Sequence, residues 1–350
     1  MFCPDSSRER GGMTNSTSRV FKAHSTGDLL ALLPALFGFH PQESLIAITT
    51  HGERHRFGFR LRLDIPDPAH VVEAAQKVTG YLRAQDPDGI ILLAISTSAE
   101  PAGALVEALR DELGDIPLIE AARGDGDRYW SYLCNNEACC PSEGTRYGGQ
   151  CSEVVATAVY NGMQILPDRE SLVRQFAAPT GPKRKAMVAA TNGVARSTAH
   201  QRNGSNAGGL QALGMAQLQP IIDRHLGHSG FMSDDEVALF SVWGSSIPVR
   251  DELWGRLRRD NAEEWLELLI EVSRRTVPPF EPAILSLTSF AAWLTGDGVQ
   301  ALIAIERALA VDGDYSMANL ILNTLDSGLD PGHWHGLGQG ELGQGDRLTS

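Results

Sequence analysis

The feature that most constrains the fold is a change of sequence pattern part-way along the chain. Before about residue 178, short apolar runs typical of strands alternate with segments of helical spacing. "SLIAITT" is bounded by turn residues, "RFGFRLRLDI" has apolar residues at period two, and "DGIILLAIST" is apolar throughout. Helical spacing is found in "DPAHVVEAAQKVTGYLRAQ" and in Ala102–Leu113. Because strands separated by helices need crossover connections, we predict an α/β domain over residues 20–177, with a mixed, partly parallel sheet covered by helices.

After this change, the clear patterns are all helical. Ser233 with Glu236, and Asn261 with Glu264, have the spacing of N-terminal helix caps, and Leu and Trp residues follow at helical intervals. We predict an all-α helical array over residues 211–327, packed as a body separate from the α/β domain. The remaining segments are predicted from composition to be a disordered leader (1–19), a linker with a possible short helix (178–210) and a flexible tail (328–350).

Length and charge restrict the kind of partner. A chain of 350 residues has room for two domains, and its formal net charge of −13 disfavours nucleic acid as a partner. Apolar stretches such as Ile90–Ile95 are far shorter than the ~20 residues that cross a bilayer, and the polar N-terminus is unlike a secretory signal. The sequence therefore predicts a cytoplasmic protein with a protein or small-molecule partner, and leaves the oligomeric state open.

Four segments in a fixed order resemble one protein family. They are "DLLALLPALFGFHPQESLIAI", "RYWSYLCNNEACCPSEG", "VRDELW" and "AAWLTGDGVQALIAIERALAVDGDYSMANLILNTLDSGLDP". Together they resemble a family of uncharacterised actinobacterial proteins catalogued as domain of unknown function 4192, over about Phe21 to Pro331. The resemblance implies no reaction, cofactor or partner.

A narrower resemblance concerns "LTGDGVQALIAIERALAVDGDY". It is similar to the second half of a tetratricopeptide repeat, with Gly296 and Asp297 in the turn and small residues such as Ala301 and Ala308 at packing positions. Gly313 departs from the repeat, which usually ends in proline. We expect a helical hairpin inside a larger helical array, because an isolated repeat cannot bury its faces.

The cysteines form the most chemically suggestive cluster. Cys134, Cys139 and Cys140 are followed by Cys151, and the four-residue gap between the first two fits a zinc knuckle. Adjacent cysteines rarely reach one ion together, so three alternatives stay open: a zinc site on Cys134, Cys139 and Cys140, buried thiols beside a turn, or redox or nucleophilic chemistry of the thiols. No other cofactor is implied.

The second candidate site lies where the apolar run "LLALLPALF" breaks at "GFHP". Pro34 is expected to kink or end a helix there, and Pro41 keeps His40 out of helical conformation. A functional His40 needs a partner such as Glu43 or Asp64 to set its tautomer and charge. We predict His40, Glu43 and Asp64 as candidate binding residues, and the alternative is a structural turn.

Standard catalytic signatures are absent from the sequence. It has no phosphate-binding loop ending in Gly-Lys-Ser/Thr, no His-Glu-x-x-His and no Gly-x-Ser-x-Gly. We expect a protein- or small-ligand-binding or regulatory module. The alternative is an enzyme of unrecognised type with a cleft in the α/β domain and, in one version, a cysteine-ligated metal.

Overall fold

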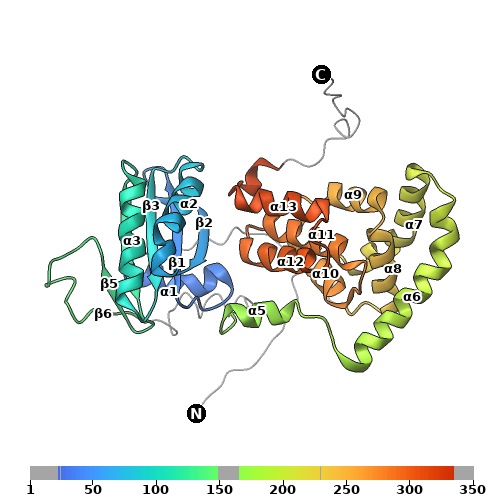
Figure 1. Ribbon diagram of the computed structural model, residues 1–350, viewed down its shortest axis with the longest axis horizontal. Coiled ribbons are helices and arrows are strands. Elements are labelled where there is room, and N and C mark those ends of the chain that lie inside the picture. Colours follow the sequence, from blue (N-terminus) through green and yellow to red (C-terminus); the bar gives the residue numbers. More distant parts are fainter. Residues whose placement is uncertain (1–22, 24, 149–164, 229, 335–350) are drawn as a thin grey trace, which may run out of the picture.

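The computed structural model describes residues 23, 25–148, 165–228 and 230–334. An α/β region and a helical array lie side by side, with helix α5 (Arg169–Gln175) below the junction in the view of Figure 1. The predicted leader, residues 1–19, lies outside the described residues. None of the described helices has both the length and the apolar character needed to span a membrane.

The α/β region is built on a six-stranded sheet in the order β2-β1-β3-β4-β5-β6. Its strands are β1 (Ser44–His51), β2 (Arg56–Asp64), β3 (Gly89–Ile95), β4 (Leu118–Gly124), β5 (Arg128–Ser131) and β6 (Thr145–Arg146). Strands β3 and β4 are parallel, and the other neighbouring pairs are antiparallel. The predicted mixed, partly parallel sheet is confirmed.

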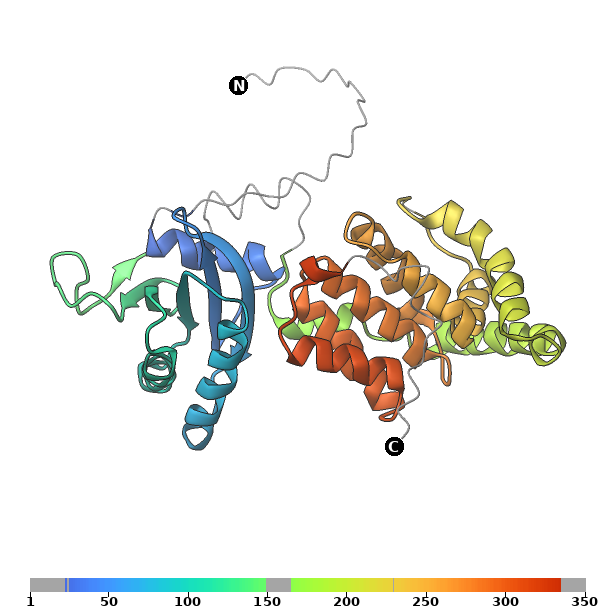
Figure 2. The ribbon, with the colours of Figure 1, turned by 90° about the horizontal axis from the view of Figure 1, so that it is seen from above.

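Helices cover both faces of this sheet (Figure 2). Helices α2 (Val71–Arg83) and α3 (Ala99–Leu113) lie on one face, after a short 3-10 turn, η1 (Pro68–His70). Helix α1 (Thr26–Phe37) lies on the other face. Helix α3 connects the two parallel strands, as a crossover unit requires.

Helix α1 differs from the prediction at its C-terminal end. Pro34 lies inside the helix, which continues to Phe37. The helix ends at Gly38, whose φ of +74° is the left-handed conformation that glycine adopts without strain, and whose N–H donates to the Pro34 carbonyl at 2.9 Å. Gly38 therefore sets the break before His40.

The second half of the chain is helical, as predicted. After α5 its helices are α6 (Gly181–Asn203), α7 (Ala207–His225), α8 (Asp234–Gly244), α9 (Ile247–Arg256), α10 (Ala262–Arg275), α11 (Glu281–Leu294), α12 (Gly298–Val311), α13 (Ser316–Asp326) and the 3-10 turn η3 (Pro331–His333). Every residue of α11 is buried, between α10 and α12. Helices α11 and α12 form a hairpin, whose similarity to a tetratricopeptide repeat stays a prediction.

Two segments differ from their predicted character. Residues 178–210, predicted as a linker with a possible short helix, contain the 23-residue helix α6 and the start of α7. The predicted flexible tail, 328–350, begins with residues 328–334, which pack on the array. Trp334 stacks on Trp254 and donates its indole N–H to the Leu257 carbonyl at 3.1 Å. Residues 335–350 lie outside the described part.

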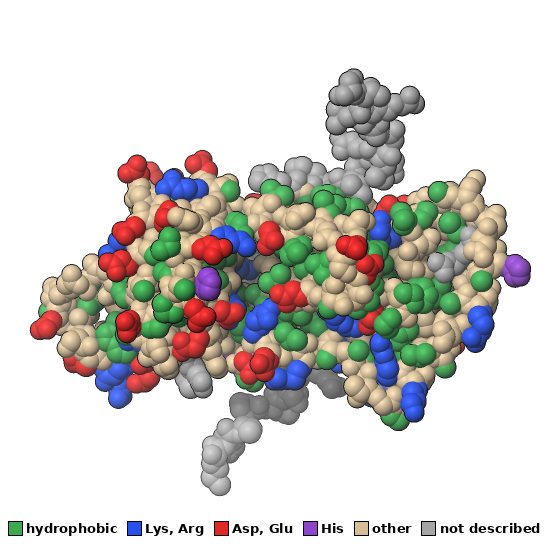
Figure 3. All heavy atoms as spheres, in the orientation of Figure 1, with side chains coloured by type: hydrophobic (Ala, Val, Ile, Leu, Met, Phe, Trp, Pro, Cys, Tyr) green, Lys and Arg blue, Asp and Glu red, His purple; other side chains and the backbone are tan. Residues whose placement is uncertain are grey.

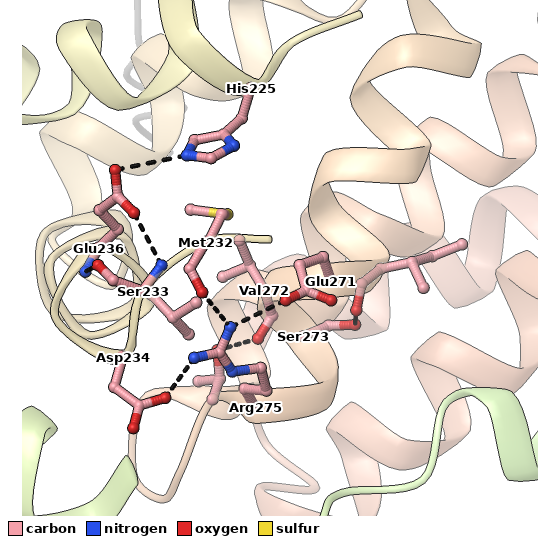
Figure 4. A network of polar contacts seen from close by, with 12 residues as sticks. His225, Met232, Ser233, Asp234, Glu236, Glu271, Val272, Ser273 and Arg275 are labelled. Atoms are coloured by element: carbon pink, nitrogen blue, oxygen red, sulfur yellow. Dashed lines mark hydrogen bonds and ion pairs between the residues drawn. The ribbon is translucent and has the colours of Figure 1, made fainter. Parts of the chain in front are cut away.

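The predicted cap at Ser233 is present. Ser233 and Glu236 exchange side-chain and backbone hydrogen bonds at the start of α8, which forms a capping box. Beside it, Arg275 of α10 pairs with Asp234 and donates to the Met232 carbonyl at 2.6 Å (Figure 4).

The second predicted cap differs. Asn261 makes no capping hydrogen bond to α10 and instead binds the loop before that helix, through the Arg258 N–H and the Arg256 carbonyl.

The two regions share part of their core. One hydrophobic cluster fills the space between the sheet and α2 and α3. A second cluster begins between the sheet and α1, includes Leu172 of α5 and Phe176 at the end of that helix, and continues into the helical array. Arg307 of α12 also donates to the Phe176 carbonyl at 2.6 Å. The two regions therefore share a hydrophobic cluster, while the described second half adds no strand to the sheet, and the division into two domains stays a prediction.

Candidate functional site

A pocket of about 300 Å³ opens at one edge of the sheet, beside α1. Its lining comes from α1, the loop before β1, the segments after β3 and β4, and the end of the β5–β6 hairpin. The apolar lining residues are Leu30, Leu33, Pro34, Pro41 and Ile95, and the polar ones include His40, Gln42, Glu43, Ser96, Thr97, Asp125 and Tyr147.

The topology explains why polar side chains gather there. The carboxyl ends of the parallel strands β3 and β4 lie at the same edge, where α/β proteins commonly bind ligands. Ser96 and Thr97 follow β3, and Asp125 follows β4. Ser44, the first residue of the antiparallel strand β1, is paired with Ile95, so the loop containing His40 and Glu43 reaches the same edge.

The Glu43 carboxylate is held by the loop after β3. One oxygen accepts a hydrogen bond from Ser96 Oγ at 2.6 Å, and the other accepts from the Thr97 N–H at 3.1 Å and from Thr97 Oγ1 at 3.2 Å. Partial burial works to raise the pKa of Glu43, but these hydrogen bonds and the charge of Arg123 outweigh it and hold the pKa below its usual value. Glu43 is therefore ionised at neutral pH.

Arg123 lies beneath this loop. It is a β4 residue with only 8% of its surface exposed, and its guanidinium donates to the Ser96 carbonyl at 2.9 Å. The same guanidinium stacks over the Trp130 ring of β5, 4.0 Å from the ring centroid. Arg123 thus fixes the backbone of the segment that binds Glu43.

Asp125 supplies a second carboxylate. One of its oxygens accepts from the N–H groups of Asp127 at 2.9 Å and Arg128 at 2.7 Å, which closes the turn between β4 and β5. Partial burial opposes ionisation, but these backbone hydrogen bonds and the charge of Arg123 lower the pKa of Asp125. The pocket therefore has two ionised carboxylates in its lining.

The backbone of His40, another lining residue, is fixed by a hydrogen bond to a distant segment. Its N–H donates to the Leu166 carbonyl at 3.0 Å, beside an isolated β-bridge between Phe39 and Leu166. Burial lowers the pKa of the His40 ring, so the imidazole is neutral at pH 7. Within the described residues no side chain hydrogen-bonds this ring, so the geometry provides no carboxylate–histidine pair for acid–base catalysis.

Tyr147 lies against Gly124 at the edge of the pocket. Burial raises the pKa of its phenol, which is therefore protonated at neutral pH. A Cβ at Gly124 would lie 2.8 Å from the Tyr147 hydroxyl oxygen, too close for any other residue without a shift. Glycine at the end of β4 thus leaves room for this ring.

The structure brings together part of the predicted site. His40 and Glu43 line the pocket, whereas Asp64 does not: it is exposed at the end of β2 and forms an ion pair with Arg62. Asp125, Ser96 and Thr97 also line the pocket and were not among the predicted residues. Their position just after predicted strands was the signal that could have found them.

The predicted cysteine cluster is a separate feature, outside the pocket lining. The Sγ atoms of Cys134, Cys139 and Cys140 all lie within 4.8 Å of one another, and those of Cys134 and Cys139 are 3.1 Å apart. Hydrogen bonds from its two neighbours lower the pKa of the Cys134 thiol, whereas the hydrogen bond with Cys134 raises the pKa of Cys140 to about 12. Cys151 lies outside the described residues.

Comparison with known proteins places the chain in a family. The family model described as "Domain of unknown function (DUF4192)" matches residues 27–332. The chain belongs to this family. The matched range includes the whole pocket lining and the cysteine cluster, so both lie within the domain that defines the family. No curated protein and no solved structure matches the chain.

Proposed function

We propose that the protein is a non-enzymatic, cytoplasmic binding module that holds a small organic cation in the pocket at the ends of β3 and β4. The observation that carries the proposal is the pairing of two carboxylates, Glu43 and Asp125, with an apolar wall from α1. A ligand with an ammonium or guanidinium group and a short apolar body matches both parts of this lining.

The electrostatics of the pocket support a cationic ligand. The pKa values of Glu43 and Asp125 are both lowered, so both groups stay ionised well into the acidic range. Arg123, the nearby positive charge, is buried and already bound to the Ser96 carbonyl and the Trp130 ring. Acidic side chains are also frequent on the face of the α/β region drawn in Figure 3, which favours the approach of cations.

A binding role is supported over an enzymatic one by the surroundings of His40. A general base needs a group that orients it, and no side chain of the described residues hydrogen-bonds the His40 ring. The two carboxylates are also occupied with structural hydrogen bonds from Ser96, Thr97 and the turn after β4. These contacts favour a fixed, pre-formed recognition surface.

The test compares two probes of similar shape and opposite charge. Phenethylamine and 3-phenylpropanoate are each added to the full chain, and saturation-transfer NMR measures contact with the protein. We expect transfer to the amine and none to the carboxylate. Asp125→Asn keeps the turn, because an amide oxygen still accepts hydrogen bonds from the two N–H groups. It removes the negative charge and should weaken amine binding about fivefold, which corresponds to the free energy of a partly exposed ion pair.

A matched control separates the pocket from general surface charge. Asp64→Asn removes an exposed carboxylate of the same region that lies outside the lining, and it should leave amine binding unchanged. Equal binding of the two probes, or equal weakening by both variants, would contradict the proposal. Conversion of the amine over time, visible as new NMR signals that disappear in His40→Gln, would favour the enzymatic alternative.

A further inference from the structure

The thiol loop, defined as residues Leu133–Glu143, is built around its three sulfur atoms. It connects β5 to β6 and carries Cys134, Cys139 and Cys140. The N–H groups of Cys139 and Cys140 both donate to the Asn136 carbonyl, at 3.1 and 2.8 Å, so the backbone turns and brings both side chains back toward Cys134. This local turn places the adjacent residues Cys139 and Cys140 on the same side of the loop as Cys134.

The two ends of the thiol loop are fixed to strand β5. At its start, Ser131 Oγ accepts from the Cys134 N–H at 3.2 Å. At its end, the Trp130 indole N–H donates to the Ser142 carbonyl at 3.0 Å, and Arg128 donates to the Glu143 carbonyl at 3.1 Å. The adjoining Gly144 has a φ of +81°, and a Cβ there would lie 2.6 Å from the Trp130 ring. Both ends of the loop are therefore anchored to β5.

Three close thiols fit a metal better than a disulfide. In a tetrahedral zinc–thiolate site the Zn–S distance of about 2.3 Å places the sulfurs about 3.8 Å apart. The three Sγ atoms lie within 4.8 Å of one another, so small rotations of these side chains, none of which is fully buried, reach that spacing. A disulfide would join only two of the three sulfurs and would not account for the position of the third sulfur next to them. Cys139 is exposed, which gives a metal ion a path to the cluster.

We propose that Cys134, Cys139 and Cys140 bind one zinc ion through their thiolates. The described residues then supply three of the four positions of a tetrahedral site, and soft sulfur donors favour zinc over magnesium or calcium. Binding is not a redox step: each thiol gives its proton to the solvent as a sulfur–zinc bond forms. This site is independent of the proposed cation pocket, because none of the three cysteines lines that pocket.

The experiment uses the full chain, purified without a polyhistidine tag, reduced and treated with a chelator under anaerobic conditions. Titration with Co²⁺ should give a thiolate-to-cobalt charge-transfer band and the visible bands of tetrahedral cobalt, both saturating at one ion per chain. Added Zn²⁺ should then displace the cobalt and remove these bands, since zinc binds thiolate sites more tightly. Metal analysis of the protein as isolated checks for stoichiometric zinc.

Variants locate the site. Cys139→Ser and Cys140→Ser should each weaken zinc binding by more than about 100-fold, because each removes a zinc ligand. Loss of a group that only hydrogen-bonds a ligand costs less than this. Glu137→Gln, an exposed residue of the same loop, should bind zinc like the wild type. Far-ultraviolet circular dichroism, dominated by the helical array, confirms that each variant is folded.

Three results would overturn the proposal. The first is a folded, reduced wild-type chain that gives no thiolate band with Co²⁺. The second is wild-type zinc affinity in both cysteine variants. The third is a chain isolated without reductant that contains no zinc and has the mass of a Cys134–Cys139 disulfide, which would assign the cluster to thiol oxidation instead.

Discussion

The helical array and the α/β region use their polar side chains in different ways. In the array, two buried hydroxyls of α11 bond to the helix backbone one turn earlier: Ser286 donates to the Pro282 carbonyl at 2.7 Å, and Thr288 donates to the Ile284 carbonyl at 2.8 Å. In the α/β region, the carboxylates of Glu43 and Asp125 line a pocket. The comparison teaches that these hydroxyls serve the packing of the array, whereas the ends of the strands place ionised carboxylates in the lining of a pocket.

The two regions differ in their polar groups but share one hydrophobic cluster. Phe176, 1% exposed, belongs to the same cluster as Ile46 of β1 and Trp243 of α8. Because this cluster continues across the junction, the array also supports the sheet face on which α1 lies. The opposite face, under α2 and α3, has its own cluster. We expect the array and the α1 face to unfold together.

The largest expected effect tests this shared core. Trp243 is fully buried, and Trp243→Ala should lower the free energy of unfolding by about 3–5 kcal/mol. Urea denaturation followed by circular dichroism measures this loss, and binding of phenethylamine at intermediate urea reports on the pocket. If the pocket still binds phenethylamine after the array has unfolded, the two regions unfold independently. The shared cluster would then not couple them.

Trp243→Phe is the matched control for this substitution. The indole N–H of Trp243 has no hydrogen-bond partner in the part of the chain that is described. Replacing the indole by a smaller ring removes an unsatisfied polar group, so the loss should be clearly smaller than that of Trp243→Ala.

An intermediate effect sharpens the role of polar groups in the array. Ser233→Ala removes the hydroxyl that accepts from the Glu236 N–H in the capping box of α8, and should cost about 1 kcal/mol in urea denaturation. Ser245→Ala, which removes a half-buried hydroxyl at the other end of the same helix, should cost less. A larger loss for Ser245→Ala would show that the cap contributes little to the array.

The smallest effect concerns the pH dependence of stability. Burial lowers the pKa of His40 below its usual 6.5, so on acidification the unfolded chain binds a proton before the folded chain does. Wild-type stability should therefore fall as the pH drops from about 6.5 toward the folded-state pKa. His40→Gln should reduce this slope in urea titrations at several pH values. An unchanged slope would mean that His40 is not desolvated by the pocket.

The element types could be predicted from the sequence because their patterns are local. The period-two run of β2, the apolar run of β3 and the cap at Ser233 each lie within a few residues. Helix α6 was misjudged because its glycine and polar residues lower intrinsic helix propensity, and its packing against α8 is a tertiary effect that a local pattern does not contain.

The pocket could be predicted only in part, because its two sides come from distant segments. His40 and Glu43 were recognisable at a break between apolar runs. Their neighbours Ser96 and Asp125 reach the same edge through the antiparallel pairing of β1 with β3 and the parallel pairing of β3 with β4. Asp64 lies outside this lining because it ends the outer strand β2, where its carboxylate is exposed.

The stack of Arg123 on Trp130 joins two parts of the α/β region that have been treated separately. The Trp130 ring contacts Arg123, which donates to the Ser96 carbonyl at the pocket. The Trp130 indole N–H itself donates to the Ser142 carbonyl in the thiol loop. Trp130 is thus a natural spectroscopic reporter. In a chain with six tryptophans, fluorine labelling would give its ring a resonance of its own, and occupancy at either location could be followed without an attached dye.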